Sequence, residues 1–341
     1  MDALKKLEGV GGLVGSTPLL QIDLLWRGKK RTVFAKAEFL NLTGSIKDRM
    51  AVHILRKALL SGELKEGDTI VEATSGNTGV SFSAFGRLIG CPVVIYMPDW
   101  MSYERINLMK SYGADVRLVS REEGGFKGSI ELAEKMKKEN PDRVFLPRQF
   151  DNEDNCEAHT LTTGAEIVAQ LKKIGRSVDA FVAGVGTGGT VMGCGRAVKK
   201  AFPNATIHPL EPSSSPTLST GYKIGFHRIQ GISDEFIPAI LKLNQLDAVV
   251  NVDDGDAILA AQALSRNLGL GVGISAGGNF LGALKLLNQM SEEKAQEATV
   301  VTVFVDDNKK YLSTDYSKTE EAKGNFLSPE IELLNVSAIS C

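Results

Sequence analysis

The residues best suited to chemistry in this chain lie in the short segment TGSIKDR, residues 43–49. Lys47 comes just after a small polar turn and directly before an acid and an arginine, which is typical of a solvated helix start. A lysine held in a desolvated pocket instead acts as a nucleophile or a base, because burial lowers the pKa of its amine. The segment alone leaves both interpretations open.

The turn GVGTGGT, residues 184–190, follows an expected strand and opens an expected helix. Its glycines let backbone N–H groups approach an anion, and the positive end of the helix adds attraction, so a phosphate is the expected ligand. A tight turn without a ligand is one alternative. A dinucleotide site is another, because the glycines satisfy G-x-G-x-x-G and Glu211 lies about twenty residues further on. A Walker-type loop is excluded, since no Lys-Ser or Lys-Thr follows.

Two further turns of small residues precede expected helices. TSGNTG, residues 74–79, offers hydroxyls, an amide and the free N–H groups of a helix start, which suit a carboxylate. Its alternative is that Thr74 or Ser75 is simply a helix cap. GISAGGN, residues 273–279, has similar possibilities. A phosphate turn, a carboxylate turn and a lysine together indicate pyridoxal 5′-phosphate, which a lysine binds as a Schiff base. A nicotinamide enzyme would leave Lys47 and TSGNTG unexplained.

Strand-like and helical patterns alternate along most of the chain. Branched apolar runs predict strands at 68–74, 91–98, 115–120, 143–149, 179–186, 205–212, 247–253 and 298–306. Helical spacing predicts helices at 75–90, 102–113, 125–140, 189–202, 254–269 and 275–290. This alternation predicts an α/β fold with mostly parallel sheets covered by helices. Two such series indicate two domains, with a joint near residues 148–160 where the polar stretch DNEDNCEA intervenes.

The composition excludes several other classes of protein. The 341 residues suffice for two domains, and shares of 43% hydrophobic and 23% charged residues are those of a soluble globular protein. A formal net charge of -2 without a basic run gives no electrostatic basis for nucleic-acid binding, and the apolar runs are too short to cross a bilayer. Four cysteines without a CxxC pair and four histidines make a metal site unexpected. With no signal peptide recognisable, we expect a cytoplasmic protein with reduced thiols.

The motifs and their order resemble those of the cysteine synthase and cystathionine β-synthase family of pyridoxal-phosphate enzymes. The matching segments are GSTPLL (15–20), TGSIKDR (43–49), EATSGNTG (72–79), MPDWMSYERINLMKSYGA (97–114), GTGGT (186–190), QGISDEFIP (230–238), GISAGG (273–278) and DDNKKYLST (306–314). The resemblance implies the tryptophan-synthase-β-like fold and a homodimer. It also implies a large cofactor-binding domain of residues 1–42 plus 149–317, a small mobile domain of residues 43–148, and a C-terminal tail of residues 318–341.

The resemblance further assigns roles to residues of these motifs. Lys47 matches the lysine that forms the internal aldimine, and Asn77 matches the asparagine that contacts the cofactor's ring oxygen. The implied substrate-carboxylate residues are Thr74, Ser75, Thr78 and Gln149, and the implied phosphate residues are Gly186, Thr187, Gly188, Gly189 and Thr190. In this scheme the freed lysine removes the substrate's α-proton. A leaving group then departs from Cβ to give an aminoacrylate, to which a nucleophile adds.

Two positions depart from the family. Cysteine synthases have glycine and alanine after QGI, and cystathionine β-synthases have tyrosine and aspartate, whereas this chain has Ser233, Asp234 and Glu235. A carboxylate facing the aminoacrylate would repel hydrosulfide but could act as a base for water or a neutral thiol; alternatively, both acids face solvent. At the second position, Asp307 aligns with a serine at the ring nitrogen, where a carboxylate would favour a protonated ring. If the alignment shifts by one residue, Asp307 is only a loop residue.

We therefore predict a pyridoxal-phosphate-dependent enzyme of cysteine metabolism that catalyses β-replacement or β-elimination. Asp234 favours hydrogen sulfide release from L-cysteine, with serine or a thioether as the other product. A cysteine synthase that uses O-acetylserine and sulfide, or a cystathionine β-synthase, is the alternative within this class. A dinucleotide-binding oxidoreductase is the alternative from a different class, because GVGTGG and Glu211 permit it.

Overall fold

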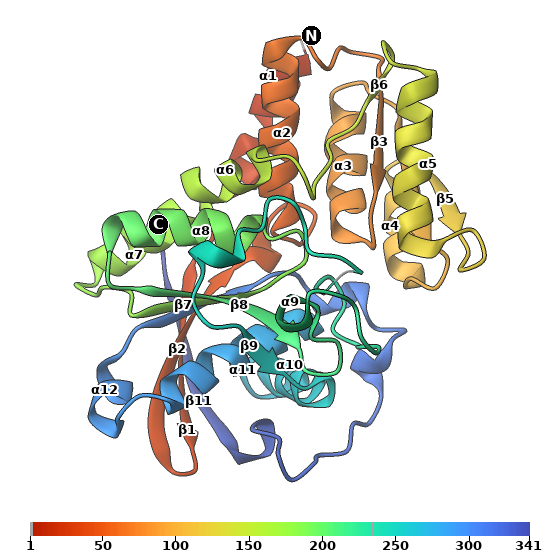
Figure 1. The fold of residues 1–341 in the computed structure, drawn as a ribbon. Coiled ribbons are helices and arrows are strands. Elements are labelled where there is room, and N and C mark those ends of the chain that lie inside the picture. Colours follow the sequence, from red (N-terminus) through yellow and green to blue (C-terminus); the bar gives the residue numbers. More distant parts are fainter. Residues whose placement is uncertain (1–2, 234) are drawn as a thin grey trace.

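The structure, a computed structural model, describes residues 3–233 and 235–341 and consists of two α/β lobes (Figure 1). The smaller lobe is built on a four-stranded parallel sheet in the order β5–β4–β3–β6. Its strands are β3 (Thr69–Ala73), β4 (Val93–Pro98), β5 (Asp115–Val119) and β6 (Val144–Phe145). Its helices are α2 (Lys47–Ser61), α3 (Asn77–Leu88), α4 (Tyr103–Ser111) and α5 (Gly125–Glu139).

The larger lobe holds a seven-stranded mixed sheet in the order β11–β1–β2–β10–β7–β8–β9. Its strands are β1 (Leu19–Trp26), β2 (Lys29–Ala37), β7 (Ala180–Gly184), β8 (Thr206–Pro212), β9 (Val250–Val252), β10 (Val300–Phe304) and β11 (Ile331–Ile339). The remaining helices are α1 (Ala3–Gly9), α6 (Asp154–Leu161), α7 (Thr163–Lys173), α8 (Gly189–Ala201), α9 (Thr217–Thr220), α10 (Asp254–Leu268), α11 (Ile274–Asn288) and α12 (Glu292–Glu297). Short 3₁₀ helices lie at Gly11–Leu13, Glu38–Leu40, Leu243–Gln245, Asn308–Lys310, Asp315–Ser317 and Ser328–Glu330.

Both sheets are covered on two faces, as the continuous apolar runs of their central strands predict. In the larger lobe α10 and α11 pack on one face and α7 and α8 on the other. In the smaller lobe α2 and α3 pack on one face, and α5 packs on the other. All eight predicted strands and six predicted helices are present, and the predicted α/β fold class is confirmed.

The larger sheet begins with an antiparallel hairpin that the alternating pattern did not predict. β1 and β2 pair from Leu19 to Trp26, and a two-residue turn at Arg27 and Gly28 joins them. Both turn residues have positive φ angles, 50° and 74°, which is the geometry that matches the twist of a hairpin. The parallel strands β10, β7, β8 and β9 follow on the β2 side.

The two ends of the chain are built into the lobes. α1 contributes Ala3 and Leu7 to the core of the smaller lobe, although the sequence places residues 1–42 with the larger one. β11, from the segment predicted to be a tail, pairs antiparallel with β1 and completes the edge of the larger sheet. Gln170 of α7 donates to the carbonyl of Ile339, which holds the end of β11 in place. The mobility of residues 43–148 stays a prediction.

Part of the predicted joint near residues 148–160 is helical. The second part of the polar stretch DNEDNCEA forms the start of α6, which begins at Asp154. Acidic residues are favoured in the first turn of a helix because its free N–H groups and dipole attract negative charge, so a polar stretch there does not indicate a linker. None of the described helices combines the length and the apolar character needed to cross a membrane.

Removing residues 327–341 should destabilise the larger lobe, because β1 would become an unpaired edge and apolar contacts of Ile331, Leu333 and Val336 would be lost. We expect a loss of about 1 kcal/mol for each of these partly buried side chains. Thermal unfolding followed by circular dichroism measures this. Leu334→Ser, at a side chain that is 47% exposed, is the control and should leave the midpoint unchanged. A truncated protein as stable as the full chain would contradict the assignment of β11 to the fold.

Candidate active site

One narrow cavity between the lobes brings together most of the predicted site residues. It lies at the carboxyl ends of strands from both sheets, where parallel sheets bind their ligands. Of the predicted residues, Lys47, Thr74, Ser75, Asn77, Thr78, Gln149, Gly186, Thr187, Gly188 and Thr190 line it. Residues that the sequence did not single out also line it, namely Ile46, Arg105, Phe150, Gln230, Gly231, Ile232, Ser275, Val303, Val305 and Tyr311. None of the described residues lining this cavity is acidic.

Lys47 is the first residue of α2, and the acid beside it shapes the turn that precedes it. Asp48 is fully buried and accepts hydrogen bonds from the backbone N–H of Thr43 at 2.7 Å and from the hydroxyl of Ser81 at 2.6 Å. Ser81 belongs to α3, so one carboxylate closes the turn and joins α2 to α3. Burial raises the pKa of Asp48, and these hydrogen bonds oppose that rise. The acid after Lys47 is therefore a structural group.

The arginine after Lys47 anchors α2 to the larger lobe. Arg49 is buried and binds the carboxylate of Glu38 at 2.6 and 2.8 Å and that of Glu166 at 2.7 and 2.8 Å. Lys36 lies 2.7 Å from Glu166 and adds a second cation. Burial opposes ionisation of Glu166, but the hydrogen bonds and charges of Arg49 and Lys36 outweigh it and hold its pKa at about 2. This buried ion-pair network fixes the start of α2, and so the position of Lys47.

The glycine turn between β7 and α8 has the form that a phosphate needs. Gly188 has a φ of 88°, which favours glycine. A side chain at Gly186 would collide with the carbonyl of Gly231, and one at Gly189 would collide with Asn155. The first N–H groups of a helix lack partners within it, so the 13-residue α8 presents donors and a positive dipole end here. This backbone cradle fits a phosphate group.

The turn between β3 and α3 is held together with a residue from a distant segment. The hydroxyl of Thr78 donates to the amide oxygen of Gln149 at 2.6 Å, and the amide nitrogen of Gln149 donates to the carbonyl of Ala73 at 2.9 Å. Glu72 is buried beneath them and accepts from the backbone N–H of Gln149 at 3.4 Å. Burial raises the pKa of Glu72 to about 8. The four residues predicted to bind a carboxylate thus lie together at the start of a helix.

Asn77 presents an unsatisfied polar atom at the cavity. Its amide nitrogen donates to Asp306 at 2.6 Å, and its buried amide oxygen has no hydrogen-bond partner among the described residues. The hydroxyl of Tyr311 donates to the same oxygen of Asp306. The carboxyl group of Asp306 is fully buried, and burial raises its pKa. A ligand hydroxyl that donates to this amide oxygen would satisfy it, so a polar group of a ligand beside Asn77 fits the site.

Two acids follow β10: Asp306 accepts from Asn77, and Asp307, which the sequence prediction places at the cofactor's ring nitrogen, is the next residue. The role of Asp307 stays a prediction. Asp307 is not among the described residues that line the cavity; it caps a 3₁₀ helix by accepting from the N–H of Lys309 at 3.1 Å. Successive side chains of extended backbone point to opposite sides, so a shift of one residue exchanges the two acids. Ser275, at the start of α11, is a polar side chain of the cavity wall that the sequence did not assign.

The loop after Gln230 is anchored at Ser233. This residue has a φ of 55°, its N–H donates to the carbonyl of Val185 at 2.7 Å, and its hydroxyl donates to the carbonyl of Ser215 at 2.9 Å. Glu235 pairs with Lys223 at 3.0 Å. Asp234, predicted to face the substrate, lies outside the described residues.

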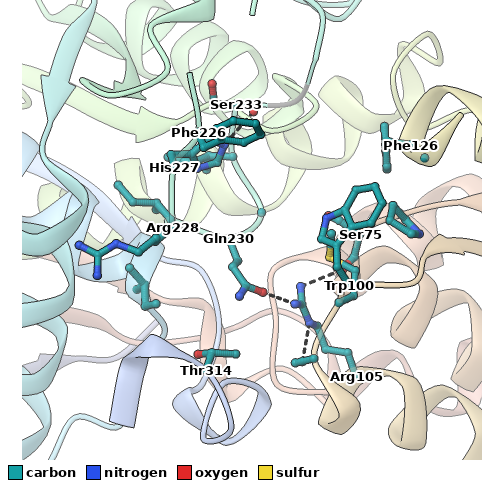
Figure 2. Close-up of a pocket in the computed structure, with 18 of the residues that line it drawn as sticks. Ser75, Trp100, Arg105, Phe126, Phe226, His227, Arg228, Gln230, Ser233 and Thr314 are labelled. Carbon is teal, nitrogen blue, oxygen red and sulfur yellow. Dashed lines mark hydrogen bonds between the residues drawn. The ribbon is translucent and has the colours of Figure 1, made fainter. Parts of the chain in front are cut away.

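A wider cavity of about 710 Å³ opens next to the narrow one (Figure 2). Its walls carry the aromatic side chains Trp100, Tyr103, Phe126 and Phe226, with Arg121, His227 and Arg228. Ser75, Arg105, Gln230, Gly231 and Ile232 line both cavities and form the passage between them. The wide cavity therefore adjoins the cavity that holds Lys47.

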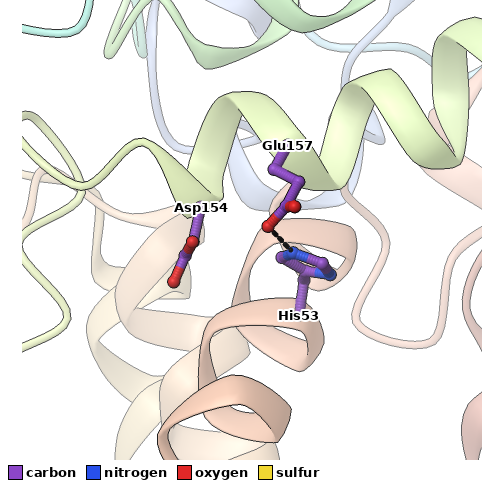
Figure 3. A group of neighbouring side chains, drawn as sticks. All are labelled: His53, Asp154 and Glu157. Atoms are coloured by element: carbon purple, nitrogen blue, oxygen red, sulfur yellow. Dashed lines mark hydrogen bonds and ion pairs between the residues drawn. The ribbon is translucent and has the colours of Figure 1, made fainter.

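A separate group of potential metal-ligand residues joins α2 to α6 (Figure 3). Ligand atoms of His53, Asp154 and Glu157 lie within 4.8 Å of one another. The ammonium of Lys57 donates to both carboxylates, so a cation already bridges the acids. We interpret this group as an ion-pair link between the helices.

A dinucleotide site would require Glu211 to bind a ribose hydroxyl, and the structure does not allow this. Glu211 is fully buried, and its carboxylate accepts hydrogen bonds from the backbone N–H of Leu218 at 2.6 Å and from the hydroxyl of Ser219. A ribose hydroxyl therefore cannot reach it. In contrast, a cavity with Lys47 and Arg105, a glycine cradle and no described acid suits a ligand that brings a phosphate and a carboxylate, so the residues fit pyridoxal phosphate and an amino acid.

Comparisons with known proteins agree with this fit. Residues 10–306 match the family described as pyridoxal-phosphate dependent enzyme. The chain is 40% identical over 312 residues to a probable cysteine synthase of Bacillus subtilis, covering 92% of this chain and 98% of that protein. It is 39% identical over 312 residues to a cysteine synthase of Staphylococcus aureus, covering 92% and 97%.

Among solved structures, one enzyme has a higher sequence identity to this chain than these two cysteine synthases. A hydrogen sulfide-producing enzyme from Fusobacterium nucleatum shares 56% identity and a TM-score of 0.94, covering 98% of this chain and 99% of that one. An aspartate-to-asparagine variant of that enzyme has been crystallised with an alpha-aminoacrylate intermediate, again at 56% identity and a TM-score of 0.94, over 98% and 99% of the two chains. An O-ureido-L-serine synthase shares 33% identity with a TM-score of 0.82, over 94% and 97%.

Glu166→Gln should lower stability at neutral pH, by about 1–3 kcal/mol, because Arg49 loses an ionised partner. The pKa of Glu166 is about 2 in the folded protein against an ordinary 4.5. Its stabilising contribution is therefore complete above pH 4.5 and is lost as the pH falls towards 2. The variant should accordingly show a shallower fall in melting temperature across this range.

Melting temperatures between about pH 2 and pH 7 test this, with the exposed Glu293→Gln of α12 as the control. A Glu166→Gln variant whose melting temperature follows the same pH curve as the parent protein would show that the ion pair contributes no pH-dependent stability.

Proposed function

Because this chain belongs to the family of pyridoxal-phosphate dependent enzymes, we propose that it releases hydrogen sulfide from L-cysteine. The bond from Cβ to sulfur breaks, sulfur leaves as hydrogen sulfide, and water or a thiol adds to Cβ, which gives serine or a thioether. The observation that carries this proposal is the 56% identity, over 98% of the chain, to a hydrogen sulfide-producing enzyme. Pyridoxal phosphate supplies the electron sink for the substrate's Cα–H bond cleavage when it is bound.

The residues of the narrow cavity have separate roles in this proposal. Lys47 holds the cofactor aldehyde and moves the proton at the substrate's Cα. Thr74, Ser75, Thr78 and Gln149 bind the substrate carboxylate, Asn77 binds the ring oxygen, and Gly186, Thr187, Gly188, Gly189 and Thr190 bind the phosphate. Asp234 activates the nucleophile that adds to Cβ.

Net synthesis of cysteine from O-acetylserine and sulfide is the second candidate. The similarity to cysteine synthases of Bacillus subtilis and Staphylococcus aureus favours it, at 40% and 39% identity. The two reactions share the cavity and the bond broken at Cα, and they differ in the leaving group and the nucleophile. We favour sulfide release because the more similar relative produces hydrogen sulfide and because an acid follows Ser233.

We also propose a homodimer in the cytoplasm. Leu13, Leu40 and Leu42 are 54%, 55% and 45% exposed, and the N–H of Leu42 donates to the carbonyl of Leu13, so these apolar side chains lie on adjoining segments. Apolar side chains gathered in this way are typical of subunit contacts. Cys91, Cys156 and Cys194 are buried free thiols, which suits a reducing compartment. Light scattering that gives the mass of one chain would refute the dimer.

Lys47→Ala should give a folded protein that binds no cofactor covalently, because Lys47 lies at the cavity wall and contributes little core volume. We expect loss of the visible absorption band of the bound cofactor and a fall in turnover of about 10³-fold or more. Borohydride reduction followed by mass spectrometry should label Lys47 in the parent protein only. Normal turnover by the variant would remove the mechanism proposed for Lys47.

The direction of the reaction is tested by supplying L-cysteine alone and, separately, O-acetylserine with sulfide. We expect faster sulfide production from cysteine than cysteine formation from O-acetylserine. Asp234→Asn should slow the formation of serine or a thioether from cysteine by about 10²-fold, which is the typical contribution of a positioned base. A strong preference for O-acetylserine, together with unchanged cysteine breakdown in Asp234→Asn, would decide for cysteine synthesis.

A further inference from the structure

Arg105 is a buried cation at the passage between the two cavities. It lies on α4 and is only 2% exposed. Its Nε donates to the hydroxyl of Ser102 at 2.8 Å, one terminal nitrogen donates to the carbonyl of Ser75 at 2.8 Å, and the other donates to the amide oxygen of Gln230 (Figure 2). All of these acceptors are neutral, so within the described residues its charge has no carboxylate in contact.

A buried guanidinium in this position is costly without an anion in contact. Desolvation opposes folding and lowers the pKa of Arg105, and the more distant Tyr311, Asp306 and Glu104 oppose this fall only in part. Arg49, the other buried arginine near Lys47, is instead paired with two carboxylates. Arg105 also lies over the ring of Tyr311, 5.4 Å from its centroid, which adds only a weak stabilisation. The charge of Arg105 is therefore available to a ligand that carries its own negative charge.

The hydrogen bond from Arg105 to the carbonyl of Ser75 indicates that this ligand is the substrate carboxylate. Ser75 belongs to the carboxylate turn, and its carbonyl would repel a substrate carboxylate if it faced the narrow cavity. Arg105 holds this carbonyl turned towards itself, so the helix start at Asn77 remains open to an anion. A side chain at Gly76 would collide with Arg105, which shows how closely the arginine fits behind the turn.

Gln230 extends the same contact to the other lobe. It precedes the loop anchored at Ser233, and Arg105 is thus hydrogen-bonded both to the carboxylate turn of the smaller lobe and to this loop of the larger lobe. Neighbouring residues of α4 support the contact: the hydroxyl of Ser102 donates to the carbonyl of Lys310 at 2.8 Å, and Glu104 accepts from the N–H and hydroxyl of Ser313 at 2.7 Å each.

We propose that Arg105 is a positioning residue that selects substrates with a free α-carboxylate, by holding the Ser75 carbonyl away from the narrow cavity and placing a positive charge behind the turn. The proposal deepens the proposed function, on which it rests for the identity of the substrate as an amino acid. It assigns α4 a role in substrate choice in addition to its place in the fold.

Binding of L-alanine and of L-alaninamide to the holoenzyme tests the proposal, because neither has a leaving group at Cβ. The change in the visible absorption of the bound cofactor gives the two dissociation constants. In Arg105→Gln the dissociation constant for alanine should rise by about 30-fold, the value of a charge-assisted hydrogen bond. In the same variant the dissociation constant for alaninamide should change by less than about 3-fold. Arg105→Lys should give an intermediate rise in the dissociation constant for alanine, because lysine keeps the charge but lacks the planar fork of the guanidinium.

Arg121→Gln is the matched control, since this arginine lines the wide cavity, stacks 5.0 Å over Trp100 and is exposed. It should leave both constants unchanged. Equal weakening of alanine and alaninamide in Arg105→Gln, or no change in either, overturns the proposal. If Arg105→Gln does not fold, Arg105→Lys decides alone: a preference for alanine as large as in the parent protein overturns the proposal. Alanine binding is measured without any sulfide release, so failure of the proposed function is seen separately, in the cysteine assay.

Discussion

The active site depends on one buried ion-pair network, in which Arg49 joins Glu38 and Glu166 directly behind Lys47. A lysine at the start of a helix is free to move with that helix, and a chemical step at a substrate carbon needs the amine held in place. Arg49 is covalently only two residues from Lys47, and both of its carboxylate partners belong to the larger lobe. Breaking one pair would leave a buried charge, which is far more costly than the pair is stabilising. The network therefore gives α2 a fixed position on the larger lobe, and Asp48 links α2 in turn to α3 and its carboxylate turn.

The parts of the site that could be predicted from the sequence are those specified by backbone sterics. A side chain at Gly186 would collide with the backbone carbonyl of Gly231, and one at Gly189 would displace the side chain of Asn155. Such a requirement leaves a readable local motif, and the same holds for the small residues of TSGNTG. The alternation of strands and helices was equally predictable, because it rests on local apolar periodicity. These patterns singled out Lys47 and the turns at residues 74–79 and 184–190, and most of these residues line one cavity.

The parts that could not be predicted depend on contacts between distant segments. β11 has only partly buried side chains and is a strand because β1 offers an edge, which no local pattern of residues 331–339 reveals. Which of Asp306 and Asp307 contacts Asn77 depends on the side of an extended segment that each faces, and the sequence does not show this. Arg105 resembles any helix arginine until Ser75 and Gln230 are brought beside it. In each case the sequence shows the chemical type of the residue, but it does not show which distant residue contacts it.

The charge of the narrow cavity links these observations to its chemistry. The described residues of its wall include the cations Lys47 and Arg105 and no acid, so a positive potential is built into a poorly solvated space. Acids do lie nearby, but each of them is bound within the fold, since Asp48 accepts from Thr43 and Ser81, and Asp306 accepts from Asn77 and Tyr311. A phosphate and a carboxylate from the proposed ligands would add negative charge beside this wall. A neutral analogue that fills the same space would add none beside Arg105, whose hydrogen-bond acceptors are all neutral.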